Sequence, residues 1–310
     1  MQSFLSLYLW RFVMSDIKKV FSGAATALIT PFSDGKVDYP SLERMLEYQI
    51  SSGINALVVC GTTGEPATLD DAEHKEVIEF CVEKVNHRVP VIAGTGSNDT
   101  AYAIELSKFS QKAGADGLLL VTPYYNKCSQ SGIVKHFNMI ADAVDIPCII
   151  YNVPGRTGFC ISLESYKALA DHPNIVATKE ASGNLTLMME VLEACGDRMN
   201  MYSGDDNNIV PLMSMGAIGV ISVFSNVMPA EAVRIASLCN EGRIREAAAL
   251  QLHYLKLMNA MFMQVNPIPV KTAMHFLGYC KNEYRMPLCE MSDGENEKLR
   301  TVMREYGLKV

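Results

Sequence analysis

The segment IVATKEASGN, residues 175–184, decides how the fold is interpreted. Three aliphatic residues and a threonine run directly into Lys179, and small, turn-forming residues follow. A short apolar run bounded by turn residues predicts a buried β-strand. Because a lysine at a strand end is ordinarily a solvated charge, the role of Lys179 depends on what the other strands bring beside it.

Similar apolar runs recur along the chain at intervals of roughly thirty residues, and each is followed by a helix-like pattern. The helix-like stretches begin near Ser, Asp or Thr and end near Gly, as helix caps require. This alternation predicts parallel strands covered by helices. The predicted strands are residues 24–30, 56–60, 91–94, 117–121, 148–151, 175–179, 201–203 and 218–222.

Eight strands that are apolar on both faces favour a closed (β/α)8 TIM barrel over an open doubly wound sheet, which would leave two edges to protect. The segment GTGSND at 94–99 lacks the spacing of a dinucleotide-binding glycine motif. We expect the barrel to occupy residues 14–228 and a C-terminal helical region to occupy 229–310. Residues 1–13 are expected to be an N-terminal extension, disordered or loosely docked and dispensable for activity.

Composition excludes several classes of function. The chain has 310 residues, a formal net charge of -7 at pH 7 and 49% hydrophobic residues, and no Lys/Arg cluster beyond pairs. Neither nucleic acid nor an anionic membrane surface is therefore an expected partner. The nine cysteines are scattered without a C-x-x-C pair, which predicts buried thiols in a reducing cytoplasm. The first 13 residues lack the features of a signal peptide.

Polar side chains follow several predicted strands at their carboxyl ends, where the loops of a barrel converge on one mouth. Their sequence contexts are GTTGE at 61–65, TPYYN at 122–126, YNVPGRTG at 151–158 and the lysine segment. We expect these side chains to form an active site. They are Thr62 and Thr63, Tyr124 and Tyr125, Tyr151 and Arg156, and Lys179.

A lysine held in such a mouth has a specific chemistry. Burial penalises the ammonium, so the pKa falls and a fraction of free amine can attack a ketone to form a Schiff base. The iminium of a keto acid is an electron sink for the adjacent methyl group, and loss of a proton yields an enamine nucleophile. The phenol of Tyr151, held by a threonine hydroxyl and a second tyrosine, can carry protons. Arg156 can bind a carboxylate through paired hydrogen bonds.

Together with SGDD at 203–206 and NPIPVK at 266–271, these motifs resemble, in collinear order over residues 20–310, the dihydrodipicolinate synthase family. The resemblance implies a pyruvate-dependent class I aldolase, a 4-hydroxy-tetrahydrodipicolinate synthase activity that condenses pyruvate with L-aspartate 4-semialdehyde in lysine and diaminopimelate biosynthesis. It implies no metal and no organic cofactor. It also implies a homotetramer, built as a dimer of dimers.

The resemblance further implies a role for each site residue. Lys179 forms the Schiff base, and a proton relay is made by Tyr151, Thr62 and Tyr125, the last entering from across a dimer interface. The substrate-binding positions implied are Thr63 for the pyruvate carboxylate, Arg156 for the semialdehyde carboxylate, and Gly204 and Ile221 as backbone positions lining the pocket.

Feedback inhibition by lysine is not expected. Family members that lysine inhibits carry a glutamate at the position of Tyr102 and often a histidine at that of Asp71. The chain keeps Asn98 and Tyr124 but replaces the acidic anchor with a phenol. Lysine inhibition should therefore be absent or feeble.

Three alternatives stay open on the sequence. Another pyruvate-dependent lyase, such as N-acetylneuraminate lyase or a keto-deoxy sugar acid aldolase, would share Lys179, but Arg156 favours the synthase. A metal-dependent barrel hydrolase would use Asp205, Asp206 and His74 as ligands. A non-catalytic binding protein would keep the barrel as a scaffold alone.

Overall fold

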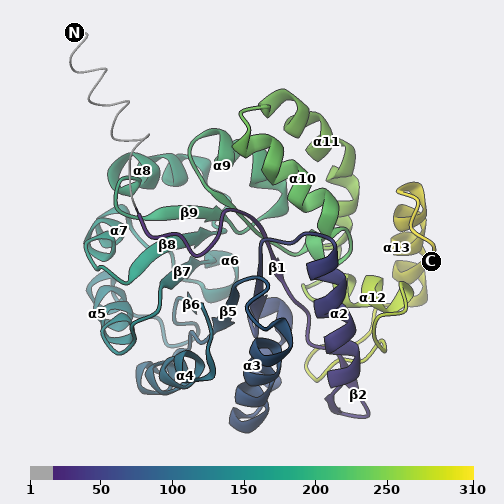
Figure 1. Ribbon diagram of the computed structural model, residues 1–310, viewed down its shortest axis with the longest axis horizontal. Helices are drawn as coiled ribbons and strands as arrows, with labels where there is room; N and C mark the ends of the chain where they lie inside the picture. The colour runs from purple at the N-terminus through teal and green to yellow at the C-terminus, as the bar shows by residue number, and fades with distance from the viewer. Residues whose placement is uncertain (1–16) are drawn as a thin grey trace.

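Eight parallel strands close into a barrel within residues 17–310, the part of the chain that the computed structural model describes (Figure 1). The strands follow one another round the barrel in chain order, and β10 pairs with β1 to close it. The predicted (β/α)8 fold is confirmed, whereas the predicted extension at 1–13 lies outside the described residues. The strands are β1 (Gly23–Ala27), β4 (Ala56–Val59), β5 (Val91–Gly94), β6 (Gly117–Val121), β7 (Cys148–Asn152), β8 (Ile175–Glu180), β9 (Asn200–Ser203) and β10 (Gly219–Ser222).

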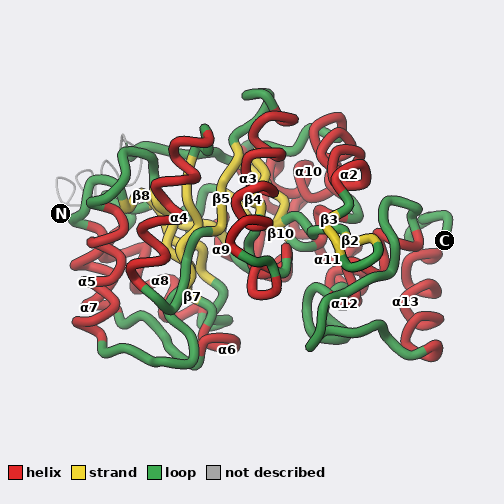
Figure 2. Tube along the Cα trace, turned by 90° about the horizontal axis from the view of Figure 1, so that it is seen from below, coloured by secondary structure: helices red, strands yellow, loops and turns green. Residues whose placement is uncertain are grey.

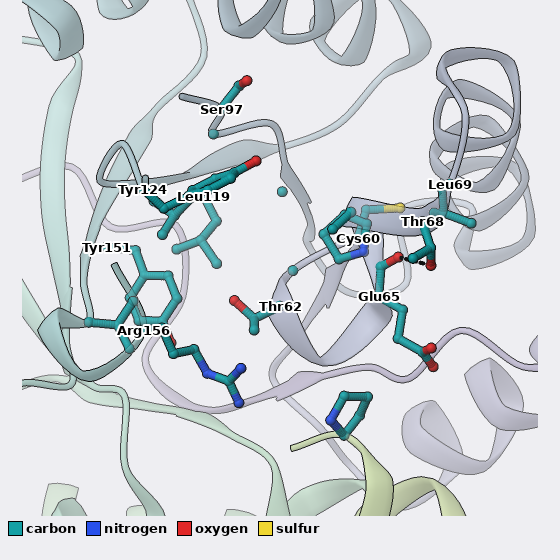
Figure 3. A pocket seen from close by; sticks show the side chains of 18 of the residues that line it. Cys60, Thr62, Glu65, Thr68, Leu69, Ser97, Leu119, Tyr124, Tyr151 and Arg156 are labelled. Atoms are coloured by element: carbon teal, nitrogen blue, oxygen red, sulfur yellow. Dashed lines mark hydrogen bonds between the residues drawn. The ribbon is translucent and has the colours of Figure 1, made fainter. Parts of the chain in front are cut away.

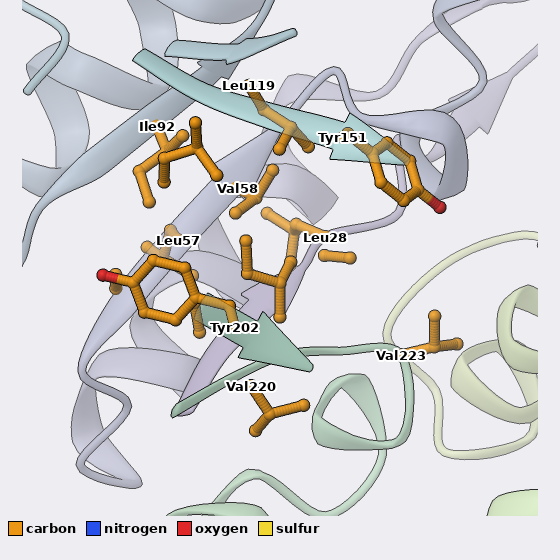
Figure 4. Packing of buried hydrophobic residues seen from close by; sticks show 14 of the residues in the cluster. Leu28, Leu57, Val58, Ile92, Leu119, Tyr151, Tyr202, Val220 and Val223 are labelled. Atoms are coloured by element: carbon orange, nitrogen blue, oxygen red, sulfur yellow. The ribbon is translucent and has the colours of Figure 1, made fainter. Parts of the chain in front are cut away.

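Burial on both faces explains why these strands read as unbroken apolar runs. Every residue of β4, β7 and β8 is buried, because side chains that point inward fill the barrel and those that point outward pack under helices. Tyr151 and Tyr202 both lie in this core, with their hydroxyl groups at opposite ends of the barrel (Figure 4). The strand register places Tyr151 beside Lys179 and Lys179 beside Tyr202.

A ring of helices surrounds the barrel. Seven of the described helices begin at a Ser, Asp or Asn whose side chain caps the first turn. Asp70 and Glu73 form a capping box at the start of α3, and Gly114 ends α4 with a left-handed φ of 98°. The helices that follow the first seven strands are α2 (Tyr39–Ser51), α3 (Asp71–Val85), α4 (Thr100–Ala113), α5 (Gln130–Ala141), the short α6 (Pro154–Thr157) with α7 (Leu163–Ala170), α8 (Leu185–Cys195) and α9 (Ile209–Ser214).

The C-terminal region is helical, with α10 (Pro229–Asn240), α11 (Ile244–Ala260), α12 (Ile268–Phe276) and α13 (Asp293–Glu305). Helix α10 packs against β1 and completes the ring, although it lies beyond the predicted barrel boundary at residue 228. That division of the chain remains a prediction. Helices α12 and α13 lie at the side of the molecule opposite α5 and α7 (Figure 2).

One element was not predicted. A hairpin of β2 (Phe32–Ser33) and β3 (Lys36–Val37) follows the first barrel strand and turns at Asp34 and Gly35, both with positive φ. An Asp-Gly pair between short apolar segments is a typical signal of such a hairpin. No helix among residues 17–310 is both long and apolar enough to cross a bilayer.

Candidate active site

A cavity of about 500 Å³ opens at the carboxyl ends of the barrel strands (Figure 3). Loops that follow β4, β5, β6 and β7 line it, together with Asn266 and Pro267 from the C-terminal region. Of the predicted site residues, which all lie in the described part of the chain, Thr62, Tyr124, Tyr151 and Arg156 line this cavity. The strand ends therefore converge as the barrel prediction required.

Lys179 lies near the end of β8 and does not itself line the cavity, but it touches a residue that does. Its Nζ is 4.2 Å from the centroid of the Tyr151 ring, and only 5% of the residue is exposed. Burial lowers the pKa of Lys179 to about 8, although the negative charges of Asp205 and Asp206 nearby act to raise this pKa. About a tenth of Lys179 is thus free amine at pH 7, far more than for a solvated lysine.

Tyr151 touches Lys179 and also lines the cavity. Burial raises the pKa of its phenol, and this outweighs the Arg156 charge and a hydrogen bond to Thr62, which both lower the pKa. The phenol therefore keeps its proton at neutral pH. A protonated phenol beside a hydroxyl and a neutral amine can pass a proton in either direction.

The loop that holds Thr62 and Thr63 is a tight turn. The two threonines and Gly64 form a single 3-10 turn, which ends at Glu65 in the left-handed region with φ 54°. Thr63 is buried, and its Oγ1 accepts a hydrogen bond of 3.0 Å from the Asn266 amide. A Cβ at Gly94 would lie 2.2 Å from the Cys60 carbonyl oxygen, so only glycine lets the neighbouring strand end approach this loop.

Arg156 extends from α6 toward the same space as Thr62 and Tyr151 (Figure 3). Its Nη2 donates to the Asn266 carbonyl oxygen at 2.9 Å. That bond uses one of five N–H groups, which leaves others available for a carboxylate.

Tyr125 is not brought to the other predicted catalytic residues of its own chain. It is 94% exposed, and its backbone is held in the left-handed region with φ 69°. The preceding residue, Tyr124, lines the cavity. The TPYYN loop therefore contributes one tyrosine to the cavity and directs the next one outward.

Gly204 directly follows β9 and Ile221 lies within β10, and neither residue is on the cavity surface. The Gly204 N–H donates to the Glu180 carbonyl oxygen at 2.8 Å, and a Cβ there would lie 2.7 Å from the Cβ of Ala181. Ile221 is fully buried in β10, where it pairs with Ala25 of β1. Neither residue lines the cavity.

Comparison with known proteins assigns the family. The model of the dihydrodipicolinate synthetase family matches residues 20–306. The chain belongs to this family. Its sequence is 52% identical to the 4-hydroxy-tetrahydrodipicolinate synthase of Geobacter sulfurreducens over 289 residues, which cover 93% of this chain and all of the relative.

Solved structures of dihydrodipicolinate synthases share the fold. The enzyme of Aquifex aeolicus superposes with a TM-score of 0.92 at 45% identity, covering 94% of this chain and 99% of the other. The chloride-inhibited enzyme of Acinetobacter baumannii, solved in complex with pyruvate, gives a TM-score of 0.91 at 41% identity, covering 93% and 99%. The resemblance to the dihydrodipicolinate synthase family that the motifs predicted is confirmed.

The ligands of the alternative metal site do not come together. Asp206 accepts hydrogen bonds from the backbone N–H groups of Val223 and Phe224, and His74 contacts the Gly94 carbonyl oxygen. Among residues 17–310, no three His, Cys, Asp or Glu side chains are grouped so that they could hold a metal ion.

Three residues at or behind the cavity of this dihydrodipicolinate synthetase family member have no role predicted from the sequence. They are Glu65, Asn266 and Lys271, which belong to the GTTGE and NPIPVK motifs. The Lys271 Nζ lies 2.6 Å from the Glu65 carboxylate, with side chains 0% and 1% exposed. The GTTGE and NPIPVK motifs are both recognisable in the sequence, but neither motif indicates that the two segments meet in the fold.

Proposed function

We propose that this protein is a 4-hydroxy-tetrahydrodipicolinate synthase that condenses pyruvate with L-aspartate 4-semialdehyde through a Schiff base on Lys179. The observation that carries the proposal is the buried Lys179 amine over the ring of Tyr151, whose hydroxyl bonds Thr62 at a cavity that Arg156 also lines. Family membership supports the same activity.

The chemistry follows from these groups. The Lys179 amine attacks the ketone of pyruvate, and loss of one water gives the iminium. Tyr151 supplies the proton for that water and, with Thr62, receives protons in later steps. The methyl carbon then loses a proton, and the resulting enamine attacks the aldehyde of the second substrate, whose oxygen takes up a proton. The amino group of that substrate displaces Lys179 from the imine carbon, which closes the ring and frees the lysine.

Carboxylate recognition completes the proposed site. Thr63 holds the pyruvate carboxylate and Arg156 that of the semialdehyde, with Gly204 and Ile221 shaping the wall. A carboxylate partner for Arg156 favours the synthase over N-acetylneuraminate lyase or a keto-deoxy sugar acid aldolase. No metal or organic cofactor takes part in these steps.

The proposed assembly is a homotetramer, a dimer of dimers, in the cytoplasm. Its support is the position of Tyr125, which is too exposed to serve its own cavity and is free to enter that of a partner. The nine cysteines, all within the described residues, are free thiols, as a reducing compartment would leave them.

Borohydride reduction tests the proposal. With pyruvate and borohydride, we expect a single covalent adduct, located by mass on Lys179 and not on Lys271, which is also buried. Condensation with aspartate 4-semialdehyde should then be fast, sialic acid cleavage absent, and both results unchanged by a chelator. Absence of an adduct would exclude the aldolase, and preferred cleavage of sialic acid would favour the alternative lyase.

A further inference from the structure

Asn266 touches both of the groups proposed to bind carboxylates. Its side-chain amide donates to Thr63 Oγ1 at 3.0 Å, and its carbonyl oxygen accepts from Arg156 Nη2 at 2.9 Å. The residue lines the cavity and is only 7% exposed. A single residue of the C-terminal region thus lies between the two subsites.

We propose that Asn266 is a positioning residue, which holds Thr63 so that its hydroxyl proton is directed to the carboxylate of pyruvate. The proposal rests on the proposed function, because it deepens the role of Thr63 in that site. It assigns to the C-terminal region a part in substrate recognition, although the Schiff base and the proton carriers all lie on the barrel.

The direction of the hydrogen bond carries the argument. A threonine hydroxyl has one proton to donate and two positions at which it can accept. Thr63 accepts from Asn266, and within residues 17–310 it makes no other side-chain hydrogen bond. Its proton therefore remains available, and a carboxylate, which only accepts, is the partner that complements it.

A second contact from the same segment fixes the loop. Lys271 pairs with Glu65 at 2.6 Å, and its Nζ lies 4.0 Å from the centroid of the Phe32 ring. The loop is thus held at two points. Asn266 bonds Thr63, and Lys271 pairs with Glu65, two residues further along the chain. Pro267 and Pro269 restrict the backbone between these two anchors. The segment can therefore act as a rigid support for the turn.

The two contacts of Asn266 can be separated by mutation. The bond to Arg156 uses the backbone carbonyl, which every substitution retains, whereas the bond to Thr63 uses the side chain. Truncation of the side chain should therefore weaken pyruvate binding and spare the semialdehyde. A generally destabilised mouth would affect both substrates.

The experiment measures KM for each substrate and kcat in the Asn266→Ala variant. We expect KM for pyruvate to rise about fivefold to tenfold, the usual worth of one hydrogen bond, with KM for the semialdehyde and kcat within about twofold. The control is Asn174→Ala, which removes hydrogen bonds to the Ala141 and Val144 carbonyl oxygens near the start of β8, at the opposite end of the barrel. That control should leave both KM values unchanged.

Two further variants extend the test, and the first of them, Asn266→Asp, keeps the proposal testable if Asn266→Ala folds poorly. Asn266→Asp keeps the size of the side chain but accepts the Thr63 proton, so it should raise KM for pyruvate at least as much. In a Thr63→Val background, Asn266→Ala should add nothing, because it acts through Thr63.

The failures of the two proposals are distinguishable. If the unmodified enzyme forms no borohydride adduct with pyruvate, the proposed function fails. If that enzyme is active but folded Asn266→Ala has an unchanged KM for pyruvate, the role of Asn266 is wrong. Equal increases for both substrates, rescue by Asn266→Asp, or additive effects with Thr63→Val would also overturn it.

Discussion

The ammonium of Lys179 lies over the aromatic ring of Tyr151, with Nζ 4.2 Å from the ring centroid. The two residues are direct partners in the register between β7 and β8, so the barrel itself fixes their contact. The face of a ring attracts a cation by about 0.5 to 2 kcal/mol, which offsets part of the cost of burying the charge. Burial still dominates, since the pKa of Lys179 falls to about 8.

This pKa predicts how Schiff-base formation depends on pH. Below pH 8, each pH unit should reduce the free amine, and with it the rate of inactivation by pyruvate and borohydride, about tenfold, whereas the rate should level off above pH 8. Asp205→Asn should move the midpoint to lower pH, because the Asp205 charge raises this pKa. Asp142→Asn, which removes a carboxylate that bonds His172, serves as the control. A midpoint near that of a solvated lysine would contradict the prediction.

The phenol of Tyr151 should be needed for proton transfer and not for the fold. Tyr151→Phe is expected to lower kcat about 10²-fold to 10⁴-fold, the usual contribution of a general acid–base group. Tyr202→Phe is the matched control, because Tyr202 is equally part of the barrel core but its hydroxyl bonds the Phe21 carbonyl oxygen at the other end. Equal losses of kcat in both variants would indicate a packing effect instead.

The buried pair of Glu65 and Lys271 should matter for stability far more than an exposed pair. Lys271→Met would leave the Glu65 carboxylate buried without its cation, which costs roughly 3 to 5 kcal/mol of the free energy of unfolding. Lys256→Met removes the exposed pair with Glu305 and should cost less than about 1 kcal/mol. Urea unfolding of the two variants measures the difference. Similar losses in the free energy of unfolding of the two variants would show that Lys271 stabilises the buried Glu65 carboxylate only a little.

The sequence predicted the barrel because burial on both faces leaves an unbroken apolar run in each strand. The prediction for the first strand, residues 24–30, continued past its observed end at Ala27, since Leu28 and Ile29 are also apolar and buried but lie outside the strand. Lys179, Tyr151 and Arg156 could be placed at one mouth because parallel strands end together. The contact between Asn266 and Thr63 spans 203 residues, and no local pattern records such a pairing.

The same limit applies to regulation by lysine. The sequence shows that Tyr102 stands where inhibited family members have a glutamate, but it does not show which groups surround Tyr102. Tyr102 lines the cavity and shares a hydrogen bond with Asp71, whose carboxylate is already paired with Lys75 at 2.8 Å. No unpaired carboxylate is therefore left at these two positions for the ammonium of an inhibitor. We expect lysine at submillimolar concentration to leave the initial rate of condensation unchanged, and Tyr102→Glu to introduce measurable inhibition. Inhibition of the unmodified enzyme in that range would contradict the prediction.

Because Tyr125 is exposed, we predict that two variants, each inactive alone, recover activity when they are mixed. If this side chain acts in the cavity of a partner subunit, Lys179→Ala and Tyr125→Ala should each be nearly inactive alone. A mixture in which subunits exchange would form mixed dimers with one complete site, because the Tyr125→Ala chain keeps Lys179 and receives Tyr125 from its partner. Random exchange of equal amounts should therefore recover about a quarter of the full activity.

Mixing Lys179→Ala with Tyr151→Ala is the control, since both residues serve the same chain and every mixed dimer lacks a complete site. Recovery in this control, or none with Tyr125→Ala, would show that Tyr125 does not act across an interface.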